Sequence, residues 1–382
     1  MQKIIEGLPF HIGYLETYSN PDGIPDILDF CYSMDVESGL VKQDVSELTL
    51  DALGAVYELG LEIGTPLSSD VLGAPYLEDF ADFVIGQTFL KSQILEIGVG
   101  RGHLSYLLSK SDRNVIGIEP GKGYSKEWGE LGIQVVSDFF PSNKIKGNFD
   151  GIVSYAVLEH VDNPALFLQA RAAQLTVEGK IFLSVPDCTE EIRDGDASMF
   201  IHEHLSYFSV KSLMRLISMA GLEGKVEKSR FGRNLYATIV SPNGKSQRQA
   251  TKSESWDVSN SARDFLDRTE KNTSSKKRLI SQYLESGTLG IFAPVRAIPF
   301  LTPAKLGYRF FDDDPRIQDR YIVPFPSRVE SRLELFAQPV DVLVIASRTF
   351  GKRIESELRA DGYEGKIALL WNEHSGEPVL GE

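Results

Sequence analysis

Two histidines and a glutamate stand side by side at His202, Glu203 and His204, and the aromatic residues Tyr207 and Phe208 follow them. An imidazole titrates near neutral pH, so this group is suited to moving a proton in catalysis. Two histidines two positions apart do not share a helix face, and the zinc pattern H-E-x-x-H is absent. We therefore predict proton chemistry at this motif and no bound metal.

A second group of candidate residues forms a glycine-rich segment. Gly98, Gly100 and Gly102 alternate with other residues, and Glu96 stands two positions before the first glycine. Glycine allows backbone angles that a Cβ forbids and lets a ligand approach the main chain closely. The spacing differs from the G-x-G-x-x-G of dinucleotide-binding folds. A helix that begins at the turn would direct its free N–H groups towards the ligand.

Buried strands must position these residues. The apolar run 94–97 predicts a strand buried on both faces, and the leucines at 104, 107 and 108 resume at helical spacing. A second strand over 114–118 leads to Glu119, which lies 23 positions after Glu96. In doubly wound folds a carboxylate about 20 residues on meets ribose hydroxyls. The order predicts an α/β fold with a ligand at the carboxyl ends of parallel strands.

Two later strands add candidates at the same edge of the sheet. Asp138 and Phe139 follow a third strand, and Tyr155 and Ala156 end a fourth. Open α/β sheets bind ligands at the carboxyl ends of their strands, so Tyr155 and Ala156 are expected beside the ligand. Phe139 is compatible equally with a ligand contact and with the core.

Glu159 and His160 directly follow the fourth strand and could be taken for a catalytic pair. We interpret them instead as helix-start and surface residues. A fifth strand over 179–185 ends at Pro186, and the His-Glu-His motif comes after it.

The order of Glu96, the three glycines and Glu119 resembles the first motif of class I S-adenosylmethionine-dependent methyltransferases. The resemblance implies a Rossmann-like seven-stranded sheet with S-adenosylmethionine as the cofactor. The acid of the motif would accept from the ligand's amino group, and the glycines would make room for its methionine part. The implied cofactor contacts are Glu96, Gly98, Gly100, Gly102, Glu119, Pro120, Asp138, Phe139, Tyr155 and Ala156.

The His-Glu-His motif with the Ser-Tyr-Phe-Ser of 206–209 resembles the sugar C-methyltransferases, which methylate the carbon beside a ketone in nucleotide-linked deoxysugars. Segments 286–294 and 311–321 resemble their C-terminal domain. The resemblance implies His204 as the general base, Glu203 as its neighbour in the active site and Tyr207 as a supporting aromatic. The predicted substrate-binding residues are Tyr57, Tyr76 and His202.

The chain departs from this family at three places. The family has an N-terminal zinc module of paired cysteines, where this chain has only Cys31. Ile201 stands where the family has a tyrosine before the motif, and Leu59 replaces a second N-terminal tyrosine. Three alternatives therefore stay open: C-methylation of a keto-sugar, O-methylation of a glycan precursor or small metabolite with His204 taking a hydroxyl proton, and a non-catalytic S-adenosylmethionine-binding protein.

Length and composition predict several domains. The 382 residues, 42% of them apolar, suffice for two or three packed cores. We predict an N-terminal cap and substrate segment at 1–88, an S-adenosylmethionine-binding core at 89–243, a linker and connecting helix at 244–285, and a smaller Rossmann-like α/β domain at 286–382.

Charge and cysteine content limit the function further. The net charge of −14 argues against a nucleic-acid substrate, whose phosphates require a basic surface. The sequence shows no apolar run of about 18 residues and no signal-peptide pattern. Cys31 and Cys188 match neither a disulfide framework nor a zinc spacing. We expect a cytoplasmic protein without a membrane partner, a monomer or homodimer, that acts on a sugar or nucleotide-linked sugar.

Overall fold

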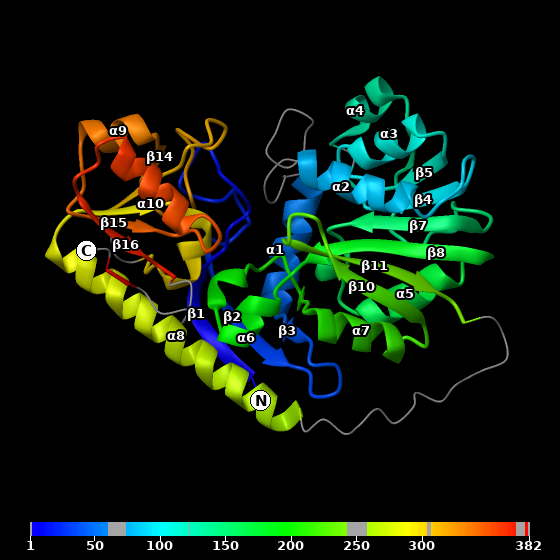
Figure 1. Ribbon diagram of the computed structural model, residues 1–382, viewed down its shortest axis with the longest axis horizontal. Helices are drawn as coiled ribbons and strands as arrows, with labels where there is room; N and C mark the ends of the chain where they lie inside the picture. The colour runs from blue at the N-terminus through cyan, green and yellow to red at the C-terminus, as the bar shows by residue number, and fades with distance from the viewer. Residues whose placement is uncertain are drawn as a thin grey trace.

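Three β-sheets and one long helix organise the chain (Figure 1). The computed structural model describes residues 2–59, 74–121, 123–242, 258–303, 307–371 and 379–380. The expected α/β fold with a central, mostly parallel seven-stranded sheet is confirmed. No helix within those ranges is both long enough and apolar enough to cross a membrane.

The seven-stranded sheet has the order β10-β11-β8-β7-β4-β5-β6, and only β11 runs antiparallel to its neighbours. Its strands are β4 (Gln93–Ile97), β5 (Asn114–Ile118), β6 (Gln134–Val136), β7 (Phe149–Tyr155), β8 (Leu175–Pro186), β10 (Glu223–Lys228) and β11 (Asn234–Val240). Because β7 and β5 flank β4, the chain reverses direction across the sheet beside β4. Ligands of open α/β sheets bind at such a point.

Helices cover both faces of this sheet, as Figure 1 shows. Along β4, Ile94 packs into the layer with α2 and α3, whereas Leu95 packs into the opposite layer with α5 and α7. This alternation is why the strand is apolar throughout. The helices are α2 (Ala74–Ile85), α3 (His103–Lys110), α4 (Ser125–Leu131), α5 (Pro164–Ala172) and α7 (Val210–Met219). Helix α2 packs on α3 and β7, so it lies with this sheet and not with the N-terminal strands.

The N-terminal segment forms a four-stranded antiparallel sheet. Its order is β1 (Gln2–Pro9), β2 (Ile27–Met34), β3 (Val41–Gln43) and β9 (Ser206–Tyr207). The edge strand β9 directly follows the His-Glu-His segment and pairs with β3. A segment far along the chain therefore supplies one strand of the N-terminal sheet. Helix α1 (Glu47–Leu59) follows these strands.

The C-terminal part begins with α8 (Val258–Ser286), which runs along one side of the molecule (Figure 1). Its sheet has the order β14-β13-β12-β15-β16-β17 and is parallel except for β17. The elements are β12 (Leu289–Phe292), η3 (Pro294–Phe300), β13 (Tyr308–Phe311), β14 (Val329–Glu330), α9 (Arg332–Ala337), β15 (Val342–Ile345), α10 (Gly351–Ala360), β16 (Lys366–Leu369) and β17 (Val379–Leu380).

The segment between β8 and α7 joins the three parts. It holds α6 (Thr189–Asp194), η2 (Ala197–Met199) and the His-Glu-His motif. One apolar core contains Phe30 of β2, Phe200 of this segment, Phe265 of α8 and Ile298 of η3. Asp196 adds a buried polar junction, because its carboxylate accepts from Arg348 at 2.9 Å and from Trp371 at 2.5 Å and lies 3.5 Å from the Lys276 ammonium. The motif is therefore attached to every sheet.

Candidate active site

The glycine turn follows β4 directly. Gly98, Gly100 and Gly102 have φ angles of 78°, 50° and 93°, which side chains rarely adopt. A Cβ on Gly98 would lie 2.4 Å from Val157 Cγ2, and one on Gly102 would lie 2.3 Å from Ile133 Cδ1. A Cβ on Gly100 would meet nothing within 4 Å. Packing thus requires glycine at 98 and 102, whereas Gly100 borders open space that a ligand can enter.

Glu96 lies beneath the turn and is 2% exposed. Its carboxyl group bonds with the Ser105 hydroxyl of α3. Burial raises the pKa of Glu96 to about 8; the Ser105 bond opposes that rise, and the charge of Glu119 adds to it. A cationic group placed next to Glu96 would favour its ionised form, which suits the predicted contact with an amino group.

The Glu119 carboxylate is fixed at the mouth of the turn. Its Oε2 accepts the Gly100 N–H at 3.0 Å and its Oε1 accepts the Gly121 N–H at 2.9 Å. The Trp128 indole donates to the Gly100 carbonyl oxygen at 2.8 Å. Pro120, which follows Glu119 in the sequence, is half-buried. A buried acid, open space over Gly100 and a fixed carboxylate fit the amino group, methionine part and ribose of S-adenosylmethionine.

Asp138 and Phe139 follow β6 at the same edge of the sheet. The Asp138 carboxylate accepts from the Ser142 hydroxyl at 2.7 Å and from the Phe139 N–H at 2.9 Å, and Lys144 lies 3.2 Å away. The Ser142 bond is the largest cause of a lowered pKa for Asp138, so this group is ionised at neutral pH. Phe139 is 69% exposed, so it is not part of the core, and its ring remains a candidate for cofactor contact.

Tyr155 and Ala156 stand where β7 ends. The Tyr155 hydroxyl accepts from Asn234 Nδ2 at 3.1 Å, and its ring lies 5.5 Å from Phe80 of α2. Burial raises the pKa of Tyr155 to about 12, so its hydroxyl stays protonated. Ala156 has a φ of 54°, and this unusual angle for alanine turns the chain out of the sheet. The predicted role of both residues beside the cofactor stays a prediction.

Backbone contacts hold the His-Glu-His segment against the loop after β7. The Leu205 N–H donates to the Glu159 carbonyl oxygen at 2.7 Å. From β3, the Gln43 side-chain amide donates to the carbonyl oxygens of His202 at 2.9 Å and His204 at 3.1 Å. The N-terminal sheet therefore helps to hold the backbone of both histidines in place.

His202 points into the core, contrary to its predicted contact with the substrate. It is 1% exposed, and its ring lies 5.0 Å from Phe10 and 5.5 Å from Phe30. Burial lowers the pKa of His202 to about 4, so the ring is neutral. A substrate would have to displace these phenylalanines to reach it. The two phenylalanines lie far from the motif in sequence, so the motif alone could not reveal this packing.

Tyr207, which the resemblance implies as a supporting aromatic of the catalytic site, is also buried. Its hydroxyl donates to the Ile201 carbonyl oxygen at 2.9 Å and lies 3.2 Å from the Ile201 nitrogen, which donates to it. Its ring centroid is 6.0 Å from that of His204. Tyr207 thus shapes the loop and supports His204, without a free hydroxyl for the reaction.

His204 lies close to Glu159 and His160 of the short helix η1 (Leu158–His160). From the sequence, these two residues are expected at a helix start on the surface. One carboxyl oxygen of Glu159 and one ring nitrogen each of His160 and His204 lie within 4.8 Å of one another. The two imidazole centroids are 4.9 Å apart. Glu159 is 1% exposed. The signal that could have revealed this pair is its position directly after a central parallel strand.

The Glu203 carboxyl group, predicted as a neighbour of His204 in the active site, faces His160. Its Oε1 lies 3.6 Å from His160 Nδ1, and its backbone carbonyl lies 3.1 Å from the same nitrogen. Burial raises the pKa of Glu203 to about 8 and lowers that of His160 to about 4. The pKa of His204 is well below its usual range because of burial first, and then because of His160 and Arg296. The side chains of Glu203, His160 and His204 are thus mainly uncharged at neutral pH.

The spacing of Glu159, His160 and His204 would also admit a metal ion. The same spacing serves proton transfer, and the prediction that no metal is required stays a prediction.

The two predicted substrate tyrosines, Tyr57 and Tyr76, belong to helices α1 and α2. Tyr57 belongs to α1, but its side chain is outside the described residues. Tyr76 of α2 packs against Phe231 at 4.8 Å between centroids and under the Arg233 guanidinium at 6.0 Å. These contacts place Tyr76 at the hairpin of β10 and β11.

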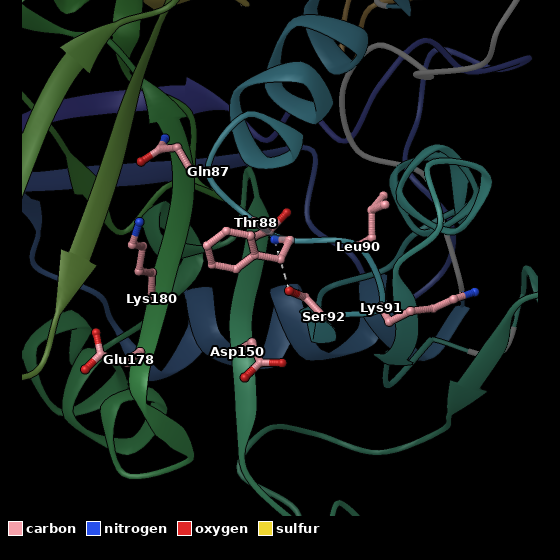
Figure 2. A pocket seen from close by; sticks show the side chains of 9 residues that line it. Gln87, Thr88, Leu90, Lys91, Ser92, Asp150, Glu178 and Lys180 are labelled. Carbon is pink, nitrogen blue, oxygen red and sulfur yellow. Dashed lines mark hydrogen bonds between the residues drawn. The ribbon is translucent and has the colours of Figure 1, made fainter.

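A cavity of about 300 Å³ lies at the opposite edge of the sheet from the glycine turn. Figure 2 shows Lys91, Ser92, Asp150, Glu178 and Lys180 around it. These residues stand at or near the starts of β4, β7 and β8, whereas the candidate site is at the ends of the strands. None of the predicted site residues lines this cavity.

Comparison with known proteins agrees with this geometry. Residues 74–227 match the family model described as a methyltransferase domain. This segment is a methyltransferase domain. The prediction of S-adenosylmethionine as the cofactor is thereby confirmed.

Known relatives of the methyltransferase domain differ in their acceptors. The chain is 33% identical over 104 residues to the ubiquinone biosynthesis O-methyltransferase of Colwellia psychrerythraea. The aligned region covers 25% of this chain and 42% of that protein. It is 23% identical over 135 residues to C-methyltransferase NovU of Streptomyces niveus, covering 34% of this chain and 32% of that protein. The chain thus spans less than half the length of these curated relatives.

Solved structures also align with part of this chain at low identity. The 1,6-didemethyltoxoflavin-N1-methyltransferase of Burkholderia thailandensis, solved with bound S-adenosylhomocysteine, is 13% identical with a TM-score of 0.40. That alignment covers 55% of this chain and 99% of that one.

Proposed function

We propose that the protein methylates a carbon beside a ketone in a sugar or nucleotide-linked sugar, with S-adenosylmethionine as methyl donor and His204 as general base. The observation that carries the proposal is the position of His204, beside the loop after β7 at the edge of the sheet that bears the glycine turn. When bound, S-adenosylmethionine supplies an electrophilic methyl group on a positively charged sulfur.

The chain's own residues would prepare the acceptor for this methyl group. His204 is neutral at pH 7 because its pKa is lowered, so a ring nitrogen is free to take the proton beside the ketone. The carbon then carries the electron pair of the broken C–H bond. Tyr207 and Gln43 hold the loop, and burial of the surrounding side chains keeps water from competing for the proton.

Three observations support a small acceptor with a ketone. The His-Glu-His motif resembles that of sugar C-methyltransferases, and one matched relative bears the name C-methyltransferase. The net charge of −14 disfavours a nucleic-acid acceptor.

O-methylation is the second candidate function, and the 33% identity to an O-methyltransferase favours it. In that reaction His204 would take a hydroxyl proton, and no ketone would be needed. The two reactions leave the methyl group on different atoms.

The position of the new methyl group distinguishes the two functions. The purified protein would be incubated with a nucleotide-linked keto-deoxysugar and S-adenosylmethionine labelled with carbon-13 in its methyl group. We expect a carbon-bound methyl signal in the NMR spectrum of the product. An oxygen-bound methyl on this acceptor or on a glycan precursor would establish O-methylation and contradict the first proposal.

A further inference from the structure

Glu159 is a buried acid whose carboxyl group has no hydrogen-bond partner among the residues that the structure describes. It is 1% exposed, and neither of its carboxyl oxygens has a hydrogen-bond partner among the described residues. An unpaired buried carboxyl group costs stability, so a natural protein that keeps one has a use for it. The group is directed at the two histidines, because one of its oxygens lies within 4.8 Å of a ring nitrogen of each.

Both sides of this cluster are fixed by backbone bonds. The Leu205 N–H is bound to the Glu159 carbonyl oxygen at 2.7 Å, and His160 Nδ1 lies 3.1 Å from the Glu203 carbonyl oxygen. The loop after β7 and the His-Glu-His loop are therefore held together at two points. Small side-chain rotations would bring the Glu159 carboxyl group into hydrogen-bond distance of the His204 ring.

Glu203 cannot serve His204 in the same position, because its Oε1 faces His160 Nδ1 at 3.6 Å. His204 needs an anion nearby, since burial and the positive field of Arg296 disfavour its protonated form. The carboxyl group left to stabilise that form is Glu159. In serine hydrolases a buried carboxylate orients and stabilises the catalytic histidine in this way.

We propose that Glu159 is a positioning residue that orients the His204 imidazole and pairs with it once it is protonated. This inference rests on the proposed function. In the step, a ring nitrogen of His204 forms a bond to the proton, the acceptor C–H bond breaks, and its electron pair remains on the acceptor as an enolate. The Glu159 carboxylate and the imidazolium then form a neutral pair, which later releases the proton to solvent.

The pair should give the reaction a distinct pH dependence. Burial first, and then the charge of Glu203, raises the pKa of Glu159 to about 8. The carboxylate form is the active one, so proton abstraction should speed up as pH rises through about 8. The titratable or charged groups that face Glu159 or His204 are Glu203, His160, Tyr155, Cys188, Tyr207 and Arg296.

The test compares the wild type with Glu159→Gln in the exchange of the acceptor's proton beside the ketone for deuterium. The substitution removes the ionisable group and keeps the size of the side chain. The full chain would be mixed with a nucleotide-linked keto-deoxysugar in deuterium oxide between about pH 6 and 9, and exchange beside the ketone followed by NMR. We expect Glu159→Gln to lose about 100-fold in exchange rate above pH 8, near the lower end of the value of a positioned base. Its affinity for S-adenosylmethionine should not change.

Two further variants separate a proton role from a structural one. Glu159→Asp keeps a carboxyl group, so it should fold, exchange faster than Glu159→Gln and retain the rise in rate with pH. Glu178→Gln, in the distant cavity of Figure 2, is a control of the same chemistry and should behave as wild type.

The outcomes distinguish the two proposals. Exchange by the wild type with an equal rate and pH profile in Glu159→Gln would overturn the role of Glu159 alone. A wild type that exchanges no proton from any keto-sugar tested would refute the proposed function itself. If Glu159→Gln does not fold, a flat pH profile for a folded Glu159→Asp would also overturn the inference, because that variant keeps a carboxyl group.

Discussion

Gly98 and Gly100 offer a matched pair of alanine substitutions that separate folding from cofactor binding. Both residues have positive φ, at 78° and 50°, so alanine at either one costs roughly 1–2 kcal/mol of backbone strain. The added Cβ at residue 98 would also lie 2.4 Å from Val157 Cγ2. Overpacking of this kind costs about 1–3 kcal/mol. Gly98→Ala should therefore lower the free energy of unfolding by roughly 2–5 kcal/mol, and Gly100→Ala by only about 1–2 kcal/mol.

The order reverses for cofactor affinity. A methyl group on Gly100 would enter the open space that the methionine part of S-adenosylmethionine is expected to use. A clash of about 1–3 kcal/mol corresponds to a loss in affinity of roughly 5- to 150-fold. Isothermal titration calorimetry would measure the affinity, and urea unfolding the stability. Wild-type affinity in a folded Gly100→Ala protein would show that the cofactor does not sit over this turn.

Three further outcomes are expected. Asp196→Ala should lower the melting temperature by several degrees in calorimetry, because it leaves Lys276 and Arg348 without their shared carboxylate at a buried junction; an unchanged value would show that the junction contributes nothing. The folded pKa of Glu96, about 8, is raised above the ordinary 4.5, so its stabilising contribution is complete below pH 4.5 and is lost as pH rises through 8. Glu96→Gln should therefore lose less stability than wild type over that range, by up to about 1.4 kcal/mol per pH unit in urea unfolding, and parallel curves would contradict this. Chelation with EDTA should leave methyl transfer intact, and loss of activity restored by zinc would refute a metal-free reaction.

The cofactor half of the site was predictable because local sequence determines it. Glu96 lies near the end of β4, and Gly100 and Glu119 lie in the turns after β4 and β5, where strand order alone brings them together. The seven-stranded sheet was implied by the resemblance to class I methyltransferases that these residues carry. The antiparallel strand β11 lies beside the parallel strands, between β10 and β8, and the helices cover the two faces of the sheet.

The acceptor half depends on contacts between distant segments. His202 and His204 stand in similar local sequence, but the first packs against Phe10 and Phe30, which are distant in the chain. Glu159 and His160 become partners of His204 because two loops, more than 40 residues apart, are joined through the Leu205 N–H. No local sequence pattern shows that these two loops contact each other. The rule that open α/β sheets bind ligands at the carboxyl ends of their strands would, however, have identified the loop after β7 as part of the site.

The central claim is that His204 removes a proton from the acceptor carbon. The most direct test compares wild type with His204→Asn in deuterium oxide, without methyl donor, by following exchange beside the ketone of a nucleotide-linked keto-deoxysugar by NMR. We predict exchange by the wild type and a rate about 10²–10⁴-fold lower in His204→Asn, with unchanged affinity for S-adenosylmethionine. Exchange by His204→Asn at the wild-type rate would place the base at another residue.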